Sequence, residues 1–438
     1  MKRSVDWVVC VLLAVASLAM ALWHVPQHTT VSPIDEYVYI DYLAKVPDQL
    51  VVHRGEETGE YARQFLSCNG VRAVGHYPDA MCAHPSESQE PRLPNGGVTT
   101  ADLYTPLYFG ATWLMAQPLL LLGVDDLTEA GRYTGWVWLA AGSIVLYLAL
   151  RRWRVPVVAA GGAGLIMVGS LAAYWSNTYI STDATVLFAS SLLIFGATML
   201  DRPSRRTVSL FVVFAVLASL LKLQNLMAVG SVSLFLLILA AVGATRAGDG
   251  LRSRLALFSR DKRVWAAVIG AGAALAAQGV WVAIRSAIAV GPLPDQDVSA
   301  PFGKTAFIRE ALAFLPGVSA GALDPTLLGI GAVLSSAIVA WVITGGTVGL
   351  ALSSGLGTKG EALAISALVI AVAAGPLLAI TNILVGGYYF QLPARYGMPL
   401  IPIFLTCAAL LVAQKKWAGY LLLAAGAVSY SAVMTLTG

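Results

Sequence analysis

Long apolar runs divide this chain of 438 residues, and their length limits how it can fold. A helix that crosses the hydrocarbon core of a bilayer needs about 20 consecutive apolar residues. Apolar residues make up 57% of the sequence and charged residues 12%, whereas soluble domains carry about 25% charged residues. One aqueous core cannot bury so much apolar surface. The sequence therefore predicts a polytopic membrane protein, and it excludes a soluble enzyme, a secreted domain and a disordered chain.

Counting the apolar runs predicts about eleven transmembrane helices. The predicted spans are residues 7–24, 133–150, 156–174, 184–200, 207–221, 226–244, 265–284, 327–350, 362–383, 397–413 and 417–435. The predicted fold is an all-α integral membrane protein in three parts. Residues 1–24 form a first anchor, residues 25–132 a large external loop with interfacial helices, and residues 133–438 the transmembrane bundle.

The distribution of Lys and Arg predicts the orientation. Seventeen of the 28 basic residues fall in short connections on one side of these spans, and the positive-inside rule assigns that side to the cytoplasm. The N-terminus is then cytoplasmic, and residues 25–132 face the exterior of the plasma membrane. The net charge of +4 is explained by orientation, so we expect no nucleic-acid partner.

Two segments allow a second interpretation. Residues 107–124 are apolar enough to cross, but a crossing would move Arg151, Arg152 and Arg154 outside, so we predict an interfacial or re-entrant helix. The first span could instead be a cleaved signal peptide. It ends in Trp23-His24 without a small-residue cleavage site, which favours an anchor.

Four cysteines divide into two pairs. Cys10 and Cys407 lie in predicted spans and suit packing. Cys68 and Cys82 share the external loop, where oxidation is permitted, and we predict a disulfide between them. The alternative is a metal site formed by these two cysteines with His76 and His84, although their spacing fits no standard zinc module.

The segment that follows the first span carries a candidate acid. In Ser32-Pro33-Ile34-Asp35-Glu36, Ser32 suits an N-cap and Pro33 the first helical position. Asp35 then lies in the first turn of a short helix, and Tyr39 and Tyr42 share its face. The simpler interpretation is that Asp35 and Glu36 only complement the helix dipole.

Three cations near the same membrane face are candidate anion ligands. Lys222 ends an apolar run, where a charge is costly unless it is paired or reaches a head group. Arg395 in Arg395-Tyr396 precedes the tenth span, and its planar fork suits a phosphate. Arg132 opens the second span. Snorkelling would also explain Lys222 and Arg395. Pairing with Asp125, Asp126 or Glu129 would explain Arg132.

A carboxylate and several cations at the outer leaflet suit a transferase that uses a sugar carried on a polyprenyl phosphate. Nucleotide sugars are absent outside the cytoplasmic membrane, so the activated donor must arrive on a lipid. Its phosphate is already a competent leaving group. One carboxylate then suffices as general base on the acceptor hydroxyl, while Lys and Arg stabilise the charge that grows on the departing phosphate.

The order of these parts resembles the GT-C superfamily of multipass glycosyltransferases. The matching elements are the acidic pair in Ser32-Pro33-Ile34-Asp35-Glu36, the segment Tyr104-Thr105-Pro106-Leu107-Tyr108, Arg132 at the second span, and Arg395-Tyr396-Gly397-Met398-Pro399-Leu400-Ile401-Pro402 before the tenth. Within the superfamily the chain is most similar to a group of actinobacterial multipass proteins. It has Thr105-Pro106 where related members often have two prolines, and it lacks the large C-terminal soluble domain of many relatives.

This resemblance implies an inverting transferase with Asp35 as general base and Glu36 as the next candidate. It implies that Lys222 and Arg395 hold the donor phosphate, and we add Arg132 and Tyr396 as further candidates for this role. We expect the substrate to be lined by Tyr39, Tyr42, Tyr104, Tyr108 and Tyr389. The expected acceptor is a cell-envelope glycan or glycolipid, and the expected sugar is arabinose, mannose or another hexose.

Two other classes of function stay open on the sequence. A lipid or solute transporter would place polar groups near the midplane and often has repeats, but only Gln278 lies deep in a predicted span and no repeat is visible. A non-catalytic envelope-biogenesis protein would bind lipid without turnover.

We expect no cofactor and no metal. Some members of the superfamily use a divalent cation, and Asp35, Glu36 and the acids at 125, 126 and 129 could supply oxygen ligands. The Asp295-Gln296-Asp297 element has no visible tie to Asp35.

Overall fold

The computed structural model describes residues 3–72, 82, 93–248, 250–292, 299–355 and 357–437. This part of the chain forms helices and two isolated β-bridges, with no β-strand. The predicted all-α class is confirmed for these residues. His76, His84, Asp295 and Asp297, which entered the metal predictions, lie outside the described residues.

Eight helices of the described chain are long and apolar enough to cross a membrane, and the number rises to ten if each of two bent helix pairs is one span. The eight contain α1 (Arg3–His24), α7 (Gly135–Arg152), α12 (Leu226–Ala247), α14 (Lys262–Ala287), α16 (Ile330–Ser353), α17 (Lys359–Gly386), α18 (Ile401–Val412) and α19 (Lys416–Met434). The predicted figure of eleven also counts the bent segment 156–174 and the helices α10 (Ala184–Met199) and α11 (Arg205–Leu221). These two helices have only 16 and 17 residues.

One predicted span is broken. Residues 156–174 divide into α8 (Val157–Val168) and α9 (Leu171–Thr178), which meet at 56°. The Ser170 hydroxyl caps α9 by accepting a hydrogen bond from the amide of Ala173. Gly169 closes α8 where it packs against the backbone of Tyr430, at a site with no room for a side chain. The Gly-Ser pair therefore redirects the chain.

A second bent pair lies between the predicted spans 265–284 and 327–350, where no span is predicted. Helix α15 (Lys304–Leu312) and the 3-10 turns from Gly317 to Leu328 meet at 69° and together are apolar enough for a broken span or a re-entrant loop. Helix α15 packs against α17, where the backbone of Glu310 touches Gly375. This pair therefore packs on one side against α17 and α16.

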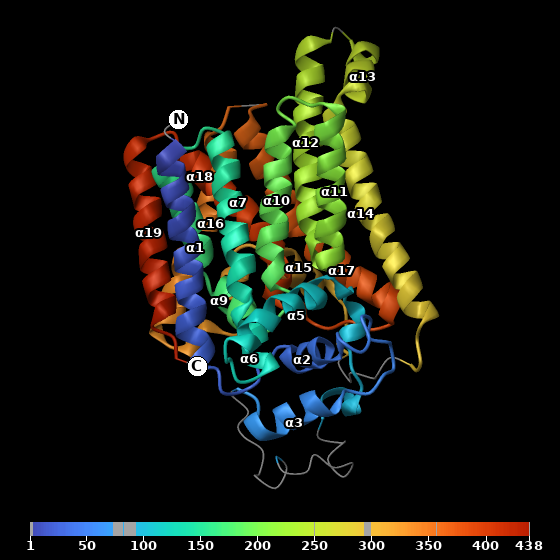
Figure 1. The fold of residues 1–438 in the computed structure, drawn as a ribbon. Helices are drawn as coiled ribbons and strands as arrows, with labels where there is room; N and C mark the ends of the chain where they lie inside the picture. Colours follow the sequence, from blue (N-terminus) through green and yellow to red (C-terminus); the bar gives the residue numbers. More distant parts are fainter. Residues whose placement is uncertain are drawn as a thin grey trace.

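The two ends of the bundle differ in charge. Figure 1 shows the N-terminus and α13 (Leu251–Arg260) at one end, and the C-terminus with α2 (Glu36–Lys45), α3 (Glu60–Asn69), α5 (Pro106–Leu121) and α6 (Leu127–Tyr133) at the other. The predicted cytoplasmic basic residues flank the helix ends near α13. We call residues 25–132 the cap.

The cap has a hydrophobic core of its own. Tyr39, Tyr42 and Leu43 of α2 pack with Phe109 of α5, and Ile180 of the bundle joins this cluster. Helix α5 lies across the end of the bundle (Figure 1) and is not among the candidate spans of the described chain. A disulfide joins Cys68 to Cys82, with sulfur atoms 2.02 Å apart. Cys10 and Cys407 are free.

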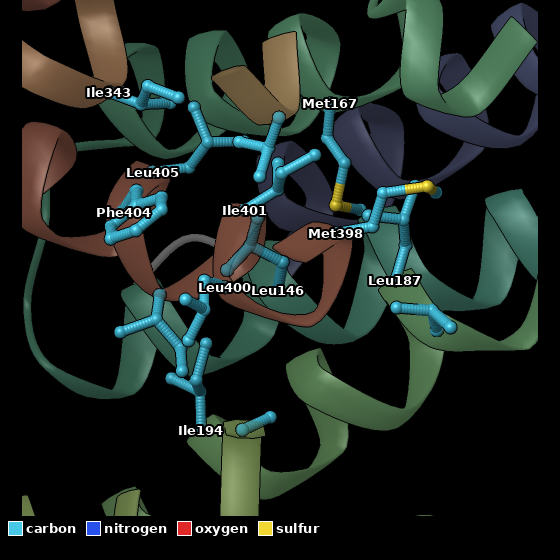
Figure 2. Close-up of a cluster of buried hydrophobic side chains, with 14 of the residues drawn as sticks. Leu146, Met167, Leu187, Ile194, Ile343, Met398, Leu400, Ile401, Phe404 and Leu405 are labelled. Atoms are coloured by element: carbon cyan, nitrogen blue, oxygen red, sulfur yellow. The ribbon is translucent and has the colours of Figure 1, made fainter. Parts of the chain in front are cut away.

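Helix α18 lies at the centre of the bundle. Its residues Ile401, Phe404 and Leu405 are fully buried and lie among Leu146, Met167, Leu187, Ile194 and Ile343 from four other helices (Figure 2). Large exposed side chains on outer helices, such as Trp341 and Leu121, are apolar, as expected for lipid-facing surfaces. The 3-10 turn Ala394–Leu400 leads directly into α18. Any side chain on this turn is therefore held in the most buried candidate span of the described chain.

Close contact between α8 and α19 depends on glycine. A Cβ atom at Gly162 would lie 2.7 Å from the backbone nitrogen of Leu423 and 2.8 Å from the carbonyl carbon of Leu422. Membrane helices commonly approach one another through such small residues. We expect Gly162→Val to destabilise the protein by about 1–3 kcal/mol through overpacking, measured as a lower thermal midpoint in detergent. Gly272→Val on α14, where no atom lies within 4 Å, is the control. Equal midpoints for both variants would contradict this packing.

Candidate functional site

Asp35 is the residue that precedes α2, and its backbone is unusual. The sequence predicts Ser32 as N-cap, but α2 begins at Glu36 and Asp35 occupies the N-cap position, so this prediction is wrong. Asp35 has φ 57°, in the left-handed region, which costs a non-glycine residue about 1–2 kcal/mol. The Ser32 hydroxyl instead accepts the amide of Ile34 within the turn. The turn directs the Asp35 side chain outward, where it is 46% exposed.

Glu36 and Arg132 form a buried ion pair. Arg132 donates from Nε to Oε1 at 2.8 Å and from Nη2 to Oε2 at 2.9 Å. The exposed fractions of the two side chains are 0% and 3%. The Glu36 carboxylate also accepts the backbone amides of Ser32 and Ile180, while Arg132 donates to the carbonyls of His28 and Thr30. Glu36 and Arg132 therefore bind each other and join three distant segments.

Lys222 lies in the tight turn between α11 and α12. Its ammonium group is 2.5 Å from Oδ1 of Asp183, and both side chains are buried. The Lys222 nitrogen also lies 5.8 Å from the centre of the Tyr104 ring. Thr105 donates to the carbonyl of Leu220, which holds the start of α5 against the end of α11. The buried charge is therefore paired with a carboxylate.

Arg395 connects the carboxylates of Asp35 and Asp183. Its Nη2 donates to Oδ2 of Asp35 at 2.7 Å, and its Nη1 is 3.9 Å from Oδ2 of Asp183. The guanidinium is 5.6 Å from the Tyr396 ring centre. Asp35, Arg395, Asp183 and Lys222 thus form a continuous chain of alternating charges. The structure brings together the predicted residues 35, 222 and 395, although Lys222 is linked to Asp35 through Asp183.

Three predicted tyrosines surround this chain of charges. The Tyr39 hydroxyl donates to that of Tyr104 at 2.9 Å, and the Tyr108 hydroxyl accepts the amide of Ser181 at 3.0 Å. Burial raises the pKa values of Tyr39 and Tyr104 well above their usual range. Both phenols therefore stay protonated at neutral pH and act as hydrogen-bonding groups rather than bases.

Two other predicted substrate-lining residues lie elsewhere. Tyr42 stacks on Phe109 and donates to the carbonyl of Leu50 inside the cap. Tyr389 packs against Phe302 and donates to the buried carboxylate of Glu310. The structure thus places Tyr42 in the cap core and Tyr389 beside α15.

A narrow pocket borders the charged residues. Its lining includes Ser32 and Ile34 before Asp35, the aromatic residues Trp175 and Tyr179, and the charged residues Asp183 and Arg395. The pocket encloses about 10 Å³, which is about the room that one water molecule needs. Asp35 is not among the lining residues, but its partner Arg395 is. The arrangement offers one exposed carboxylate beside a pocket with a cationic wall.

Sequence reasoning missed Asp183. It lies in the short connection 179–183, held in place by the bonds from Ile180 to Glu36 and from Ser181 to Tyr108. A signal was present, because Asp183 is a lone acid directly before the apolar run 184–200. A charged residue next to an apolar run needs a partner, and this argument, which identified Lys222 as a candidate, holds equally for Asp183.

The described residues contain no group of three His, Cys, Asp or Glu side chains that could hold a metal ion. Asp35 and Asp183 each contact a cationic side chain instead. No protein-family model matches the chain, and a search of curated proteins finds no match either. The chemical interpretation of this site therefore depends on its geometry.

Removal of one partner of the buried Glu36–Arg132 pair should be costly. An uncompensated buried charge typically costs about 3–5 kcal/mol, so we expect Glu36→Gln to lower the thermal midpoint strongly. Glu57→Gln is the matched control, because the Glu57 side chain is 78% exposed. The double variant Glu36→Leu with Arg132→Met should recover part of the loss. If Glu36→Gln were as stable as the control, the buried Glu36–Arg132 pair would not stabilise the fold as proposed.

Proposed function

We propose that this chain is a membrane glycosyltransferase that moves a sugar from a polyprenyl-phosphate donor to a cell-envelope glycan or glycolipid. The observation that carries the proposal is the half-exposed Asp35 carboxylate held 2.7 Å from the buried guanidinium of Arg395, at the wall of a pocket. Such a transferase needs a base that the acceptor hydroxyl can reach and a cation for the leaving phosphate.

The proposed reaction is a single displacement. The acceptor hydroxyl oxygen attacks the anomeric carbon and forms the new glycosidic bond, while the bond from that carbon to the phosphate oxygen breaks. Asp35 takes the hydroxyl proton. The electron pair of the broken bond leaves with the polyprenyl phosphate, and Arg395 and Lys222 stabilise its charge. One displacement inverts the configuration at the anomeric carbon.

The surrounding residues support this division of roles. Tyr39 and Tyr104 are protonated and can orient substrate hydroxyls, with Tyr108 and Tyr396 beside them. Asp183 positions Lys222 and faces Arg395. We propose that Glu36 and Arg132, predicted as a second acid and a phosphate ligand, position Asp35 instead, because their charges satisfy each other in a buried pair.

The location of the site supports a lipid-linked donor. The cap and the chain of charges lie at the end of the bundle opposite α13 and the basic connections. Under the positive-inside rule that end faces the exterior of the plasma membrane. A donor there has to be carried on a lipid, and its phosphate would lie at the depth of Arg395 and Lys222.

The two other functions predict different biochemistry. A transporter or flippase would move lipid-linked sugar across a vesicle membrane without changing it. A non-catalytic envelope-biogenesis protein would bind the lipid without turnover. Incubation of purified protein with labelled polyprenyl-phosphate sugars and an envelope glycolipid fraction separates all three, because only a transferase releases polyprenyl phosphate and labels the acceptor.

The first substitution to test is Asp35→Asn. Loss of a general base typically costs about 10²–10⁴-fold in rate, so we expect sugar transfer to fall by that factor while the protein stays folded and inserted in the membrane. Asparagine tolerates the left-handed conformation of residue 35, and Glu57→Gln on the exposed surface of the cap is the control. Wild-type turnover in Asp35→Asn would reject Asp35 as the base.

Metal dependence is tested by chelation. We expect turnover in EDTA to equal that in buffer, because in the described residues Asp35 and Asp183 already bind cationic side chains and no third ligand joins them. Initial rates of label transfer with and without EDTA measure this. Loss of activity that manganese or magnesium restores would show that the carboxylates hold a divalent cation during catalysis.

A further inference from the structure

Three ion pairs include or contact residues that line the pocket, and they differ in how easily they can separate. Glu36–Arg132 has exposed side-chain fractions of 0% and 3%, and Asp183–Lys222 has 6% and 2%. In Asp35–Arg395, the Asp35 side chain is 46% exposed and the Arg395 side chain 10%. Separation of a fully buried pair leaves an uncompensated charge without water. The Asp35 carboxylate can be hydrated when its partner leaves, so this pair opens at the lowest cost.

Arg395 also has a second carboxylate within reach. Its Nη1 is 3.9 Å from Asp183, and the flat guanidinium faces Tyr396. A guanidinium that releases Asp35 therefore keeps a neutralising neighbour. The other fork nitrogen, Nη2, then becomes free for a different anion. Arginine binds phosphate through this planar fork.

From this asymmetry we propose that the phosphate of the donor lipid displaces Asp35 from Arg395, and that this exchange releases the Asp35 carboxylate to act on the acceptor. The inference deepens the proposed function and rests on it. The phosphate takes the position that Asp35 Oδ2 holds on Nη2. Without donor, the base is engaged by Arg395 and the pocket stays narrow. With donor, one event provides both the bound leaving group and the free base.

The exchange explains two features of the site. The four charged groups sum to zero without substrate, so the resting site carries no unpaired charge. Asp35 holds a left-handed backbone conformation that positions its side chain at the guanidinium.

The groups that face Asp35 or Arg395 are Asp183, Lys222, Tyr39, Tyr104 and Tyr396. None of the five except Asp183 can replace Asp35 as an anion at neutral pH, because the others are an amine and three phenols.

Binding measurements on the full-length protein in phosphatidylcholine nanodiscs test the exchange. The probe is farnesyl phosphate, which carries the phosphate and a short prenyl tail but no sugar. Farnesol tests the tail alone, and inorganic phosphate as competitor tests the head group alone. The variants are Asp35→Asn, Arg395→Gln and their combination. Arg205→Gln, an exposed residue at the opposite end of the bundle, is the control.

The exchange predicts that Asp35→Asn binds farnesyl phosphate about tenfold or more tightly than wild type, because the competing charge-assisted hydrogen bond is lost. Arg395→Gln should weaken binding and remove the gain from Asp35→Asn in the double variant. Asp35→Gly, which also suits a left-handed backbone, should reproduce the gain if the asparagine variant folds poorly. A structure with farnesyl phosphate bound should show Arg395 on the phosphate and apart from Asp35.

The contrary outcomes are distinct. Unchanged affinity in Asp35→Asn together with weaker binding in Arg395→Gln overturns the exchange, but it leaves the proposed phosphate site standing. A bound structure in which Arg395 still contacts Asp35 does the same. Equal binding of farnesol, or wild-type affinity in Arg395→Gln, overturns the exchange by removing Arg395 as the phosphate ligand. Transfer assays on the wild-type protein then judge the proposed transferase separately.

Discussion

The site depends on the hydrogen bonds and the ion pair that the Glu36 carboxylate accepts. It accepts hydrogen bonds from Arg132, from the amide of Ser32 and from the amide of Ile180, and it is completely buried. A buried charge cannot lose its partners without a large cost, so the turn before α2, the start of the second span and the connection before α10 are held together. Asp35 adjoins the first of these segments and Asp183 the third.

Three of the four charged groups share a structural principle, because each lies at the end of an apolar helix. Lys222 follows α11, Asp183 precedes α10, and Arg395 lies on the turn that leads into α18. A membrane helix cannot carry a lone charge at its centre without a partner. Helix ends at one end of the bundle therefore collect the charges, and α10 and α18, which lie next to Asp183 and Arg395, pack together in the hydrophobic core shown in Figure 2.

The resting site is electrostatically complete, and this affects how it meets an anion. Asp183 neutralises Lys222, and Asp35 with Asp183 neutralises Arg395. A phosphate that enters such a site finds no unoccupied cation and has to compete for one. In the proposed exchange this competition occurs at Asp35, since only the Asp35 side chain is open to water among the carboxylates of the three pairs.

Local properties of the sequence determined the helical class, the apolar runs and the candidates Asp35, Lys222 and Arg395, because helix length in a bilayer and the cost of a charge at depth can be evaluated residue by residue. Tertiary structure alone decided the pairing. Asp35 meets Arg395 across 360 positions, Glu36 meets Arg132 across 96, and Asp183 entered only because Lys222 reaches it. The N-cap at Asp35 and the break at Gly169 also depended on packing. An ion pair forms between residues that are close in the folded chain, and a local sequence pattern does not give the distances between residues far apart in the sequence.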